Sequence, residues 1–256
     1  MGDREKNVVH DDYNDAISSH YAAYRPPLHQ ALLAEFFQTS GRGEIDIALD
    51  IGCGTGVSSR ALIPYCKAII AVDPSIAMIE QAILTTEPWA NIAYCIGDGE
   101  ALNIPDQQID LVTFAGSLNY AKSPSLLKEL KRVCKPEAHV IVYDFEVHLD
   151  EWLLCLGIQM PETAPMHYDH EINFDDCELL RRNIGSVKTV ALDVSAQNLA
   201  HVLFSSTGRY NRLQAKFQGE DAFHQVVKRL DRSGLNLQIK ATTYLYAYTQ
   251  VTSVNQ

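Results

Sequence analysis

The stretch DIGCGTG, residues 50–56, constrains the fold of this chain more than any other feature. Gly52, Gly54 and Gly56 occupy alternate positions, directly after an apolar run at residues 45–49 and a carboxylate. Glycine allows a sharp turn and leaves bare backbone for a ligand to approach. The pattern predicts a strand, a nucleotide-binding loop and a helix, which is the beginning of a doubly wound α/β sheet.

The spacing of the glycines separates two classes of cofactor. The dinucleotide fingerprint is G-x-G-x-x-G, whose last glycine would fall at Val57, whereas this loop reads G-x-G-x-G. Asp50 at the strand end would repel a pyrophosphate but attract an ammonium or a sulfonium group. S-adenosylmethionine carries both groups, so the loop favours it over NAD. A structural glycine turn that binds nothing is the alternative.

Length, composition and charge limit the possible partners. The 256 residues, 46% of them hydrophobic, suit one elaborated domain rather than two full α/β domains. The formal net charge of −11, without a Lys/Arg-rich run, argues against nucleic acid. We expect a cytoplasmic protein without a membrane partner, because no apolar stretch approaches the ~20 residues that span a bilayer. The six cysteines form no CxxC pair, which predicts reduced thiols and neither zinc nor disulfides.

Short apolar runs alternate with helical patterns between residues 45 and 146, which is typical of parallel strands joined by right-handed crossovers. The expected strands lie at residues 45–51, 68–72, 92–96, 111–115, 140–145, 187–194 and 237–251. Three clear helices are expected after Ser123, at 197–204 and at 220–232. The tyrosines that alternate in the last strand are interpreted as sheet packing.

We expect one domain in four segments. They are an N-terminal cover at residues 1–43, a cofactor-binding core at 44–146, a cap insertion at 147–185 and a completion of the sheet at 186–256.

Polar residues follow the predicted strands at the edge where doubly wound sheets bind ligands. Asp73 lies about 20 residues beyond the glycine loop and is expected to accept hydrogen bonds from both ribose hydroxyls; a helix N-cap is the alternative. Asp98 is expected to accept from an adenine amino group, with the N–H of Gly99 nearby. Met78 is placed against the adenine face, with core packing as the alternative.

Together these motifs resemble those of class I S-adenosylmethionine-dependent methyltransferases, in the small-molecule branch with type 11/25-like domains. The shared motifs are the DxGxGxG loop, the acidic end of the second strand, GDxExL at 97–102, DLV at 110–112 and LLKELKRVCKPEAHVIVYDF at 126–145. The resemblance implies a Rossmann-like sheet of seven strands, mostly parallel with an antiparallel last strand, and helices on both faces.

The resemblance also implies a set of cofactor-binding residues. They are Tyr21, Arg25, Asp50, Gly52, Cys53, Gly54, Gly56, Asp73, Pro74, Met78, Asp98, Gly99, Glu100 and Ala115. Tyr21 and Arg25 belong to a Y-x-x-x-R-P element and would close over the methionine carboxylate, since a guanidinium donates two parallel hydrogen bonds. A plain surface helix is the alternative for this element.

Methyl transfer from a sulfonium depends mainly on alignment of the nucleophile and exclusion of water. A phenol, alcohol or amine acceptor must also lose a proton, whereas a carboxylate need not. The expected catalytic residues are Asn119, Tyr120, Glu146 and His148, with His167 and His170 as further bases. Asn119 and Tyr120 replace a His-Trp pair that is frequent in small-molecule members. The two histidines could instead bind a metal, but their spacing is no ligand pattern, so no metal is predicted.

The predicted function is transfer of a methyl group to an O or N atom of a small-molecule acceptor, by a monomer or a homodimer. The N-terminal cover and the insertion favour a closed pocket. A protein or peptide methyltransferase and a non-catalytic S-adenosylmethionine-binding module are the alternatives. Nothing resembles an N/D-P-P-Y motif, which disfavours nucleic-acid bases and glutamine amides as acceptors.

Overall fold

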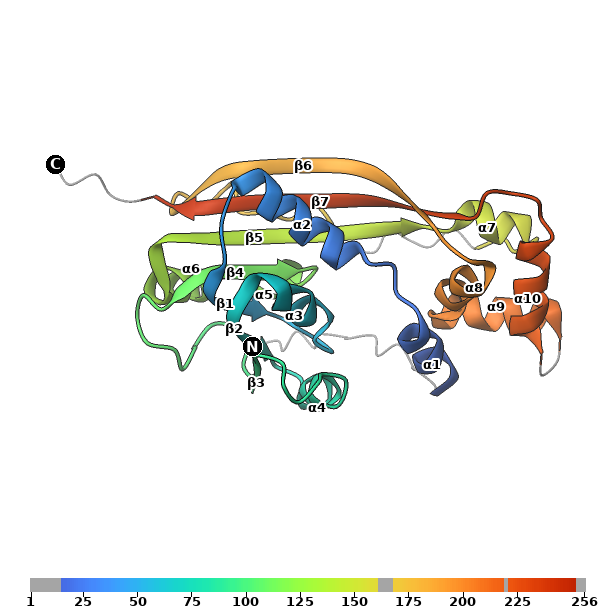
Figure 1. Ribbon diagram of the computed structural model, residues 1–256, viewed down its shortest axis with the longest axis horizontal. Helices are drawn as coiled ribbons and strands as arrows, with labels where there is room; N and C mark the ends of the chain where they lie inside the picture. Colours follow the sequence, from blue (N-terminus) through green and yellow to red (C-terminus); the bar gives the residue numbers. More distant parts are fainter. Residues whose placement is uncertain (1–14, 161–167, 219–220, 252–256) are drawn as a thin grey trace, which may run out of the picture. The chain divides into compact units, whose positions relative to one another are not determined.

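The structure is a computed structural model, and it describes residues 15–160, 168–218 and 221–251 (Figure 1). Contacts group the chain into two units. The larger unit contains Pro27–Glu146, Met166–Thr189 and Thr242–Gln256. The smaller unit contains Met1–Pro26, Val147–Pro165 and Val190–Ala241. Each unit therefore draws on three separate parts of the sequence.

A seven-stranded sheet has the strand order β3-β2-β1-β4-β5-β7-β6. The strands are β1 (Ile45–Ile51), β2 (Cys66–Asp73), β3 (Ile92–Ile96), β4 (Ile109–Ala115), β5 (Cys134–His148), β6 (Leu180–Asp193) and β7 (Gln238–Gln250). The neighbours from β3 to β5 pair in parallel. Figure 1 shows β7 running opposite to β5. The predicted doubly wound sheet with an antiparallel last strand is confirmed.

In the sequence, the helices of the larger unit lie before β1 and between the strands from β1 to β5. They are α2 (Leu28–Ser40), α3 (Val57–Leu62), the 3-10 turn η1 (Ile63–Tyr65), α4 (Ile76–Leu84), α5 (Leu118–Ala121) and α6 (Pro124–Val133). Since successive side chains of a strand point to opposite faces, the strands feed two apolar cores. Leu49 and Val112 join the core that includes α6, whereas Ala48 and Leu111 join the core that includes α2.

The alternating tyrosines of β7 are structural, as predicted. Tyr244, Tyr246 and Tyr248 are buried in the core that includes α6. Their neighbours Leu245 and Ala247 belong to the opposite core. The three rings therefore pack between sheet and helix, and no binding stack is needed to explain them.

Two strands are much longer than predicted. Strand β5 begins at Cys134, directly after α6, rather than at the predicted residue 140. Strand β6 begins at Leu180, but residues 181–186 are largely polar and mostly exposed, so they lack the alternation that reveals a strand. The start of α6 is as predicted, because the Ser123 hydroxyl accepts a hydrogen bond from the Leu126 N–H at 3.0 Å.

The smaller unit is helical apart from strand ends. It contains α1 (Asp15–Ala23), α7 (Asp150–Cys155), α8 (Ala196–Phe204), α9 (Thr207–Phe217) and α10 (Ala222–Asp231). Trp152, Leu199, Leu203 and Val226 form part of its core. Helix α9 was not predicted, since Leu213 is its one buried residue and no apolar stripe marks it. In the described ranges no helix is long and apolar enough to cross a bilayer.

Two histidines of the smaller unit join α1 to α8 through a contact that is sensitive to acid. Nδ1 of His20 lies 3.0 Å from Nδ1 of His201, so one ring must donate and the other accept. Burial and the nearby His201 lower the pKa of His20, and burial lowers the pKa of His201. The folded state therefore takes up these protons less readily than the unfolded chain, whose histidines titrate near pH 6.5. The contribution of this histidine pair to the free energy of unfolding is therefore fully present above pH 6.5, and it is lost as the pH falls below that value.

We expect the backbone amides of α1 to lose protection against hydrogen exchange as the pH falls from about 7.5 to about 5.5, after correction for the intrinsic exchange rate. Exchange measured by mass spectrometry on residues 15–23 checks this. In His201→Phe, which keeps a ring against His20 but removes one titrating group, protection should depend less on pH. The same pH dependence in both proteins would contradict the role of this pair.

Candidate functional site

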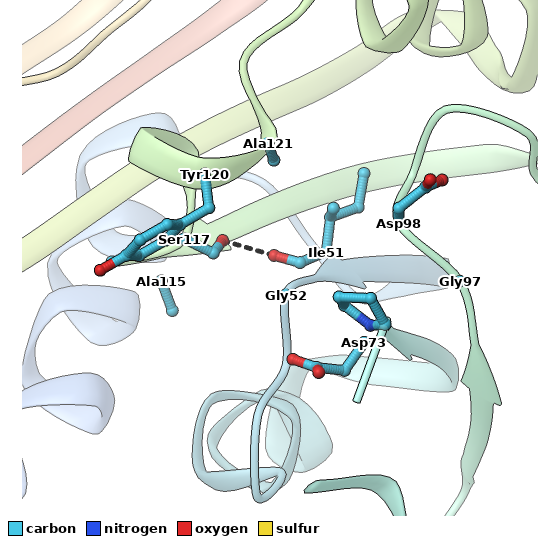
Figure 2. Close-up of a pocket in the computed structure, with 11 residues that line it drawn as sticks. Ile51, Gly52, Asp73, Gly97, Asp98, Ala115, Ser117, Tyr120 and Ala121 are labelled. Atoms are coloured by element: carbon cyan, nitrogen blue, oxygen red, sulfur yellow. Dashed lines mark hydrogen bonds between the residues drawn. The ribbon is translucent and has the colours of Figure 1, made fainter. Parts of the chain in front are cut away.

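A cavity of about 320 Å³ opens at the carboxyl ends of four parallel strands in the larger unit. It is lined by residues at or directly after the ends of β1, β2, β3 and β4, where doubly wound sheets bind ligands. They are Ile51, Gly52, Asp73, Pro74, Gly97, Asp98, Ala115, Gly116, Ser117, Tyr120 and Ala121. Figure 2 shows Ser117 and Tyr120 on the left of this space and Asp98 on the right. Five predicted cofactor residues are thus brought together: Gly52, Asp73, Pro74, Asp98 and Ala115.

The glycine loop holds the ends of three strands close together. Gly52 has φ +72°, and a Cβ there would lie 2.4 Å from the Cβ of Ser117. The N–H groups of Gly52 and Cys53 donate to the Val72 carbonyl at 2.8 and 3.0 Å. A Cβ on Gly54 would instead meet no atom within 4 Å. The loop therefore serves two purposes: Gly52 allows a close backbone approach, and Gly54 leaves open space beside the cavity-lining segment.

Asp50 lies beneath the loop, and its predicted direct contact with a ligand is corrected by the structure. The side chain is completely buried and does not line the cavity. Its carboxylate accepts hydrogen bonds from the hydroxyls of Ser58 and Ser59 at 2.6 Å and of Thr113 at 2.8 Å. Burial raises the pKa of Asp50, and these three hydroxyls oppose the rise. Asp50 thus ties β1 to α3 and β4 and fixes the base of the loop.

Asp73 both supports the glycine loop and lines the cavity. Its Oδ2 accepts a hydrogen bond from the Gly54 N–H and its Oδ1 from the Ser75 N–H, both at 2.9 Å. The N-cap of α4 is Ser75, whose hydroxyl accepts from the Met78 N–H at 3.4 Å. The alternative that Asp73 is the helix cap is therefore wrong. A carboxylate oxygen has more than one acceptor site, so both oxygens can still accept from a ligand.

The segment after β3 forms the other wall. Asp98 lines the cavity, and its Oδ1 accepts a hydrogen bond from the Glu100 N–H at 2.9 Å. The backbone of Gly99 packs closely, because a Cβ there would lie 3.0 Å from Ile51. Glu100 accepts from the Ser123 hydroxyl at 2.6 Å. Gly99 and Glu100 therefore position the turn that presents Asp98.

Comparison with known sequences and structures shows which proteins this chain is similar to. Residues 49–142 match the family model described as a methyltransferase domain. A Schizosaccharomyces pombe protein named as an uncharacterized methyltransferase is 28% identical over 240 residues, which cover 88% of this chain and 90% of that protein. A Dictyostelium discoideum protein named as a methyltransferase is 28% identical over 135 residues, which cover 53% of this chain and 49% of the relative.

A malonyl-[acyl-carrier protein] O-methyltransferase of Halorhodospira halophila is 39% identical over 101 residues, which cover 38% of this chain and 34% of that enzyme. The match thus spans about half or less of the Dictyostelium and Halorhodospira relatives. Among solved structures, a protein from Anaeromyxobacter dehalogenans aligns with a TM-score of 0.53 at 19% identity, over 79% of this chain and 88% of that one. The MccD protein aligns with a TM-score of 0.52 at 16% identity, over 88% and 99%. These structures share the fold.

The matched family segment runs from β1 into β5 and contains the glycine loop, Asp73 and Asp98. Residues 49–142 therefore form a methyltransferase domain with the motifs and the fold of the class I S-adenosylmethionine-dependent methyltransferases.

Two further predicted cofactor residues, Cys53 and Met78, are not among the residues that line the cavity. Met78 is 44% exposed on α4, so the alternative that it only fills the core is wrong. Cys53 is buried, and burial together with the charges of Asp50 and Asp73 raises the pKa of its thiol. This cysteine stays protonated and contributes packing rather than charge.

The residues after β4 form one wall of the cavity, and two residues of this segment, Asn119 and Tyr120, were predicted to act on the acceptor. The Ser117 hydroxyl donates to the Ile51 carbonyl, drawn as the dashed line in Figure 2. Tyr120 lines the cavity and is 82% exposed. Asn119 instead donates through its amide to the carbonyl of Asp169 at 2.7 Å. Asn119 therefore holds a segment of the insertion beside the cavity wall, while Tyr120 remains available to a ligand.

Several predicted residues are not brought to the cavity by the geometry described here. Glu146 ends the larger unit's first long segment, whereas Tyr21, Arg25 and His148 belong to the smaller unit, so their roles stay predictions. His167 lies outside the described residues. Within the described part of the chain, no group of three His, Cys, Asp or Glu side chains is arranged to hold a metal ion.

Sequence reasoning missed two polar residues beside the cavity, Asp144 and Tyr168. The Tyr168 hydroxyl lies 2.7 Å from the Gly116 carbonyl and 2.8 Å from Oδ2 of Asp144, so its one proton can be donated to either acceptor. Asp144 stands near the end of the predicted strand 140–145, so the strand-end rule could have found it. Tyr168 carries no such signal, because it comes from the insertion 24 residues later.

Proposed function

We propose that this methyltransferase binds S-adenosylmethionine in the 320 Å³ cavity and transfers its methyl group to an O or N atom of a small molecule. The observation that carries the proposal is the pair of carboxylates, Asp73 and Asp98, which line the same cavity as Gly52 of the glycine loop. A volume of this size falls at the lower end of the range for small-molecule sites, ~300–1,000 Å³.

The residues present fit the cofactor. Asp73 would accept hydrogen bonds from the two ribose hydroxyls, since both its oxygens are held by single backbone N–H donors and face the cavity. Asp98 and the backbone of Gly99 would meet the adenine edge, and the open space at Gly54 would admit the methionine part. The bound cofactor supplies a methyl group that is already activated by a positively charged sulfur.

The protein's own contribution is orientation and exclusion of water. The walls after β1 and β4 are locked together by the Ser117–Ile51 hydrogen bond and by the contact at Gly52. A rigid wall holds an acceptor in line with the methyl group, and such orientation supplies as much as ~7–11 kcal/mol of the barrier. Tyr120 would cover the acceptor from the solvent side.

The names of several relatives support a small acceptor. Segments of about 100 to 125 residues are 29% identical to a ubiquinone/menaquinone biosynthesis C-methyltransferase of Hydrogenovibrio crunogenus and 31% identical to a 2-methyl-6-phytyl-1,4-hydroquinone methyltransferase of Synechocystis. The acidic chain also disfavours nucleic acid as a substrate. A cytoplasmic location and a monomeric or homodimeric state stay predictions.

Isothermal titration of the full chain tests the proposal. We expect one equivalent of S-adenosylmethionine, or of its demethylated product S-adenosylhomocysteine, to bind with micromolar affinity, while NAD under the same conditions gives no binding heat. Binding of NAD in preference to either compound, or no binding of any of the three, would refute the proposed function.

A further inference from the structure

Three side chains from two parts of the larger unit, strand β5 and the segment after residue 167, meet beside the cavity. Oδ2 of Asp144 lies 2.9 Å from Nδ1 of His170 and 2.8 Å from the Tyr168 hydroxyl. Oδ1 of the same carboxylate accepts a hydrogen bond from the Phe145 N–H at 2.7 Å. The carboxylate is therefore held in place from two directions, and it in turn fixes both rings. We call Asp144, Tyr168 and His170 the β5 triad.

The β5 triad borders the acceptor wall. In the sheet register Tyr143 pairs with Ala115, so Asp144 stands beside Gly116, which lines the cavity. The Tyr168 hydroxyl touches the carbonyl of Gly116, and its ring centroid lies 6.1 Å from that of Tyr120. A Cβ on residue 116 would come within 3.2 Å of both Asp144 and Tyr168. The triad is thus packed directly against the cavity-lining backbone at the ends of β4 and β5.

The hydrogen bonds leave one nitrogen of His170 unused. Because a carboxylate only accepts, the ring must carry its proton on Nδ1, and the lone pair then resides on Nε2. Within the described residues no hydrogen bond reaches Nε2. The side chain is 30% exposed, so a proton taken up there can leave to solvent. A carboxylate that orients an imidazole in this way is the arrangement that makes histidine a general base.

A tyrosine ring packs against His170, and carboxylates lie near the hydroxyl of that tyrosine. His170 stacks on Tyr244 with ring centroids 5.9 Å apart. Four carboxylates lie near enough to Tyr244 to raise the pKa of its hydroxyl, after the larger effect of burial: Glu146, Glu171, Asp144 and Asp169. Among the described residues, no lysine or arginine offsets these carboxylates at Tyr244. His170 therefore stands in an acidic part of the larger unit.

We propose that His170, oriented by Asp144, is the general base that removes the proton of a phenolic acceptor in this methyltransferase. The inference rests on the proposed function and specifies its acceptor. The phenol O–H proton passes to Nε2, the oxygen lone pair forms the new C–O bond, and the C–S bond breaks with its electron pair going to sulfur. The products are an aryl methyl ether, S-adenosylhomocysteine and a proton released from the imidazolium.

The geometry favours a phenol over the other acceptors. A carboxylate acceptor is already deprotonated, so its methylation would not require the His170–Asp144 pair. An aliphatic alcohol holds its proton far more tightly than a phenol, whose pKa is about 10. The rings of Tyr120 and Tyr168 lie beside each other at the cavity wall and suit a flat acceptor.

The orientation of His170 can be tested without any acceptor. Long-range ¹H–¹⁵N NMR of the cofactor-free chain should show His170 protonated on Nδ1 and unprotonated on Nε2 at neutral pH. In Asp144→Asn this tautomer should no longer dominate, while S-adenosylhomocysteine should bind within about twofold of the wild-type affinity by calorimetry. The opposite tautomer in the wild type would overturn the proposal.

The chemical role is tested with hydroquinone and 4-chlorophenol as phenolic probes and benzoate as a carboxylate probe. His170→Gln should lower kcat for the phenols about 100-fold or more at neutral pH and remove the rise of rate with pH. His170→Gly should regain activity when imidazole is added, which a purely structural role would not allow. His224→Gln, at a 78% exposed histidine of the smaller unit, is the matched control and should change nothing.

The outcomes separate this inference from the proposed function. Phenols methylated equally well by His170→Gln, or benzoate methylated while phenols are not, would overturn the base assignment and leave the methyltransferase assignment intact. Methylation of none of the probes by a chain that binds S-adenosylhomocysteine would overturn the phenol assignment. Failure to bind S-adenosylhomocysteine would refute the proposed function itself.

Discussion

Replacing Asp73 with asparagine is expected to weaken the binding of S-adenosylmethionine about 100-fold or more. Each hydrogen bond between a ribose hydroxyl and an ionised carboxylate contributes about 1.5–3 kcal/mol, and two such bonds would be impaired together. Every 1.4 kcal/mol corresponds to about a tenfold change in Kd. Titration calorimetry of the wild type and Asp73→Asn with S-adenosylhomocysteine measures the difference.

The control must separate lost binding from a disturbed loop, because Asp73 also accepts from the N–H groups of Gly54 and Ser75. Asparagine keeps one acceptor oxygen, so the melting temperature without ligand should fall only slightly. Asp46→Asn is the matched variant, since Asp46 lies at the opposite end of β1, half exposed and paired with Lys67. An unchanged Kd in Asp73→Asn would disprove the ribose assignment.

Gly52→Ala is expected to damage both stability and cofactor binding. The left-handed conformation at φ +72° costs about 1–2 kcal/mol for a residue with a Cβ. The new Cβ would also lie 2.4 Å from Ser117 Cβ, and the turn after β4 must shift to relieve the clash. Overpacking of this kind costs a further ~1–3 kcal/mol. Urea unfolding measures the first effect and calorimetry with S-adenosylhomocysteine the second.

Gly41→Ala supplies the matched comparison. Gly41 has φ +63° after α2, and a Cβ there would meet no atom within 4 Å. This variant should therefore show the conformational cost alone and bind S-adenosylhomocysteine normally. Equal destabilisation in both alanine variants, with binding intact, would mean that the contact between Gly52 and Ser117 is not needed to form the site.

The local part of the site could be predicted from the sequence because it is contiguous along the chain. The glycine loop follows β1, Asp73 ends β2 and Asp98 follows β3, so each comes at the end of a short apolar strand. Parallel strands bring their carboxyl ends to one edge of the sheet. Asp73 and Asp98 could therefore be placed at one cavity before any distance was known. Asp144 also stands near the end of a predicted strand, so the same rule would have placed it at this edge of the sheet.

Other features depend on contacts that no local pattern encodes. Asp50 looked like a ligand contact, but three hydroxyls, one of them 63 residues away at Thr113, enclose it. The first half of β6 is polar and exposed, so its sequence does not show the alternation of a strand. It is a strand because it pairs at the edge of the sheet.

The sequence by itself determined the fold class, the edge of the sheet that carries the site and the class of cofactor, since these follow from short-range periodicity and from backbone freedom at fixed positions. Only the tertiary structure decided that Asp50 supports the loop from inside and that Asp144, Tyr168 and His170 converge on the acceptor wall. The reason is physical: which polar groups satisfy one another inside a fold depends on long-range packing, and 24 to 26 residues separate the partners of Asp144 from it.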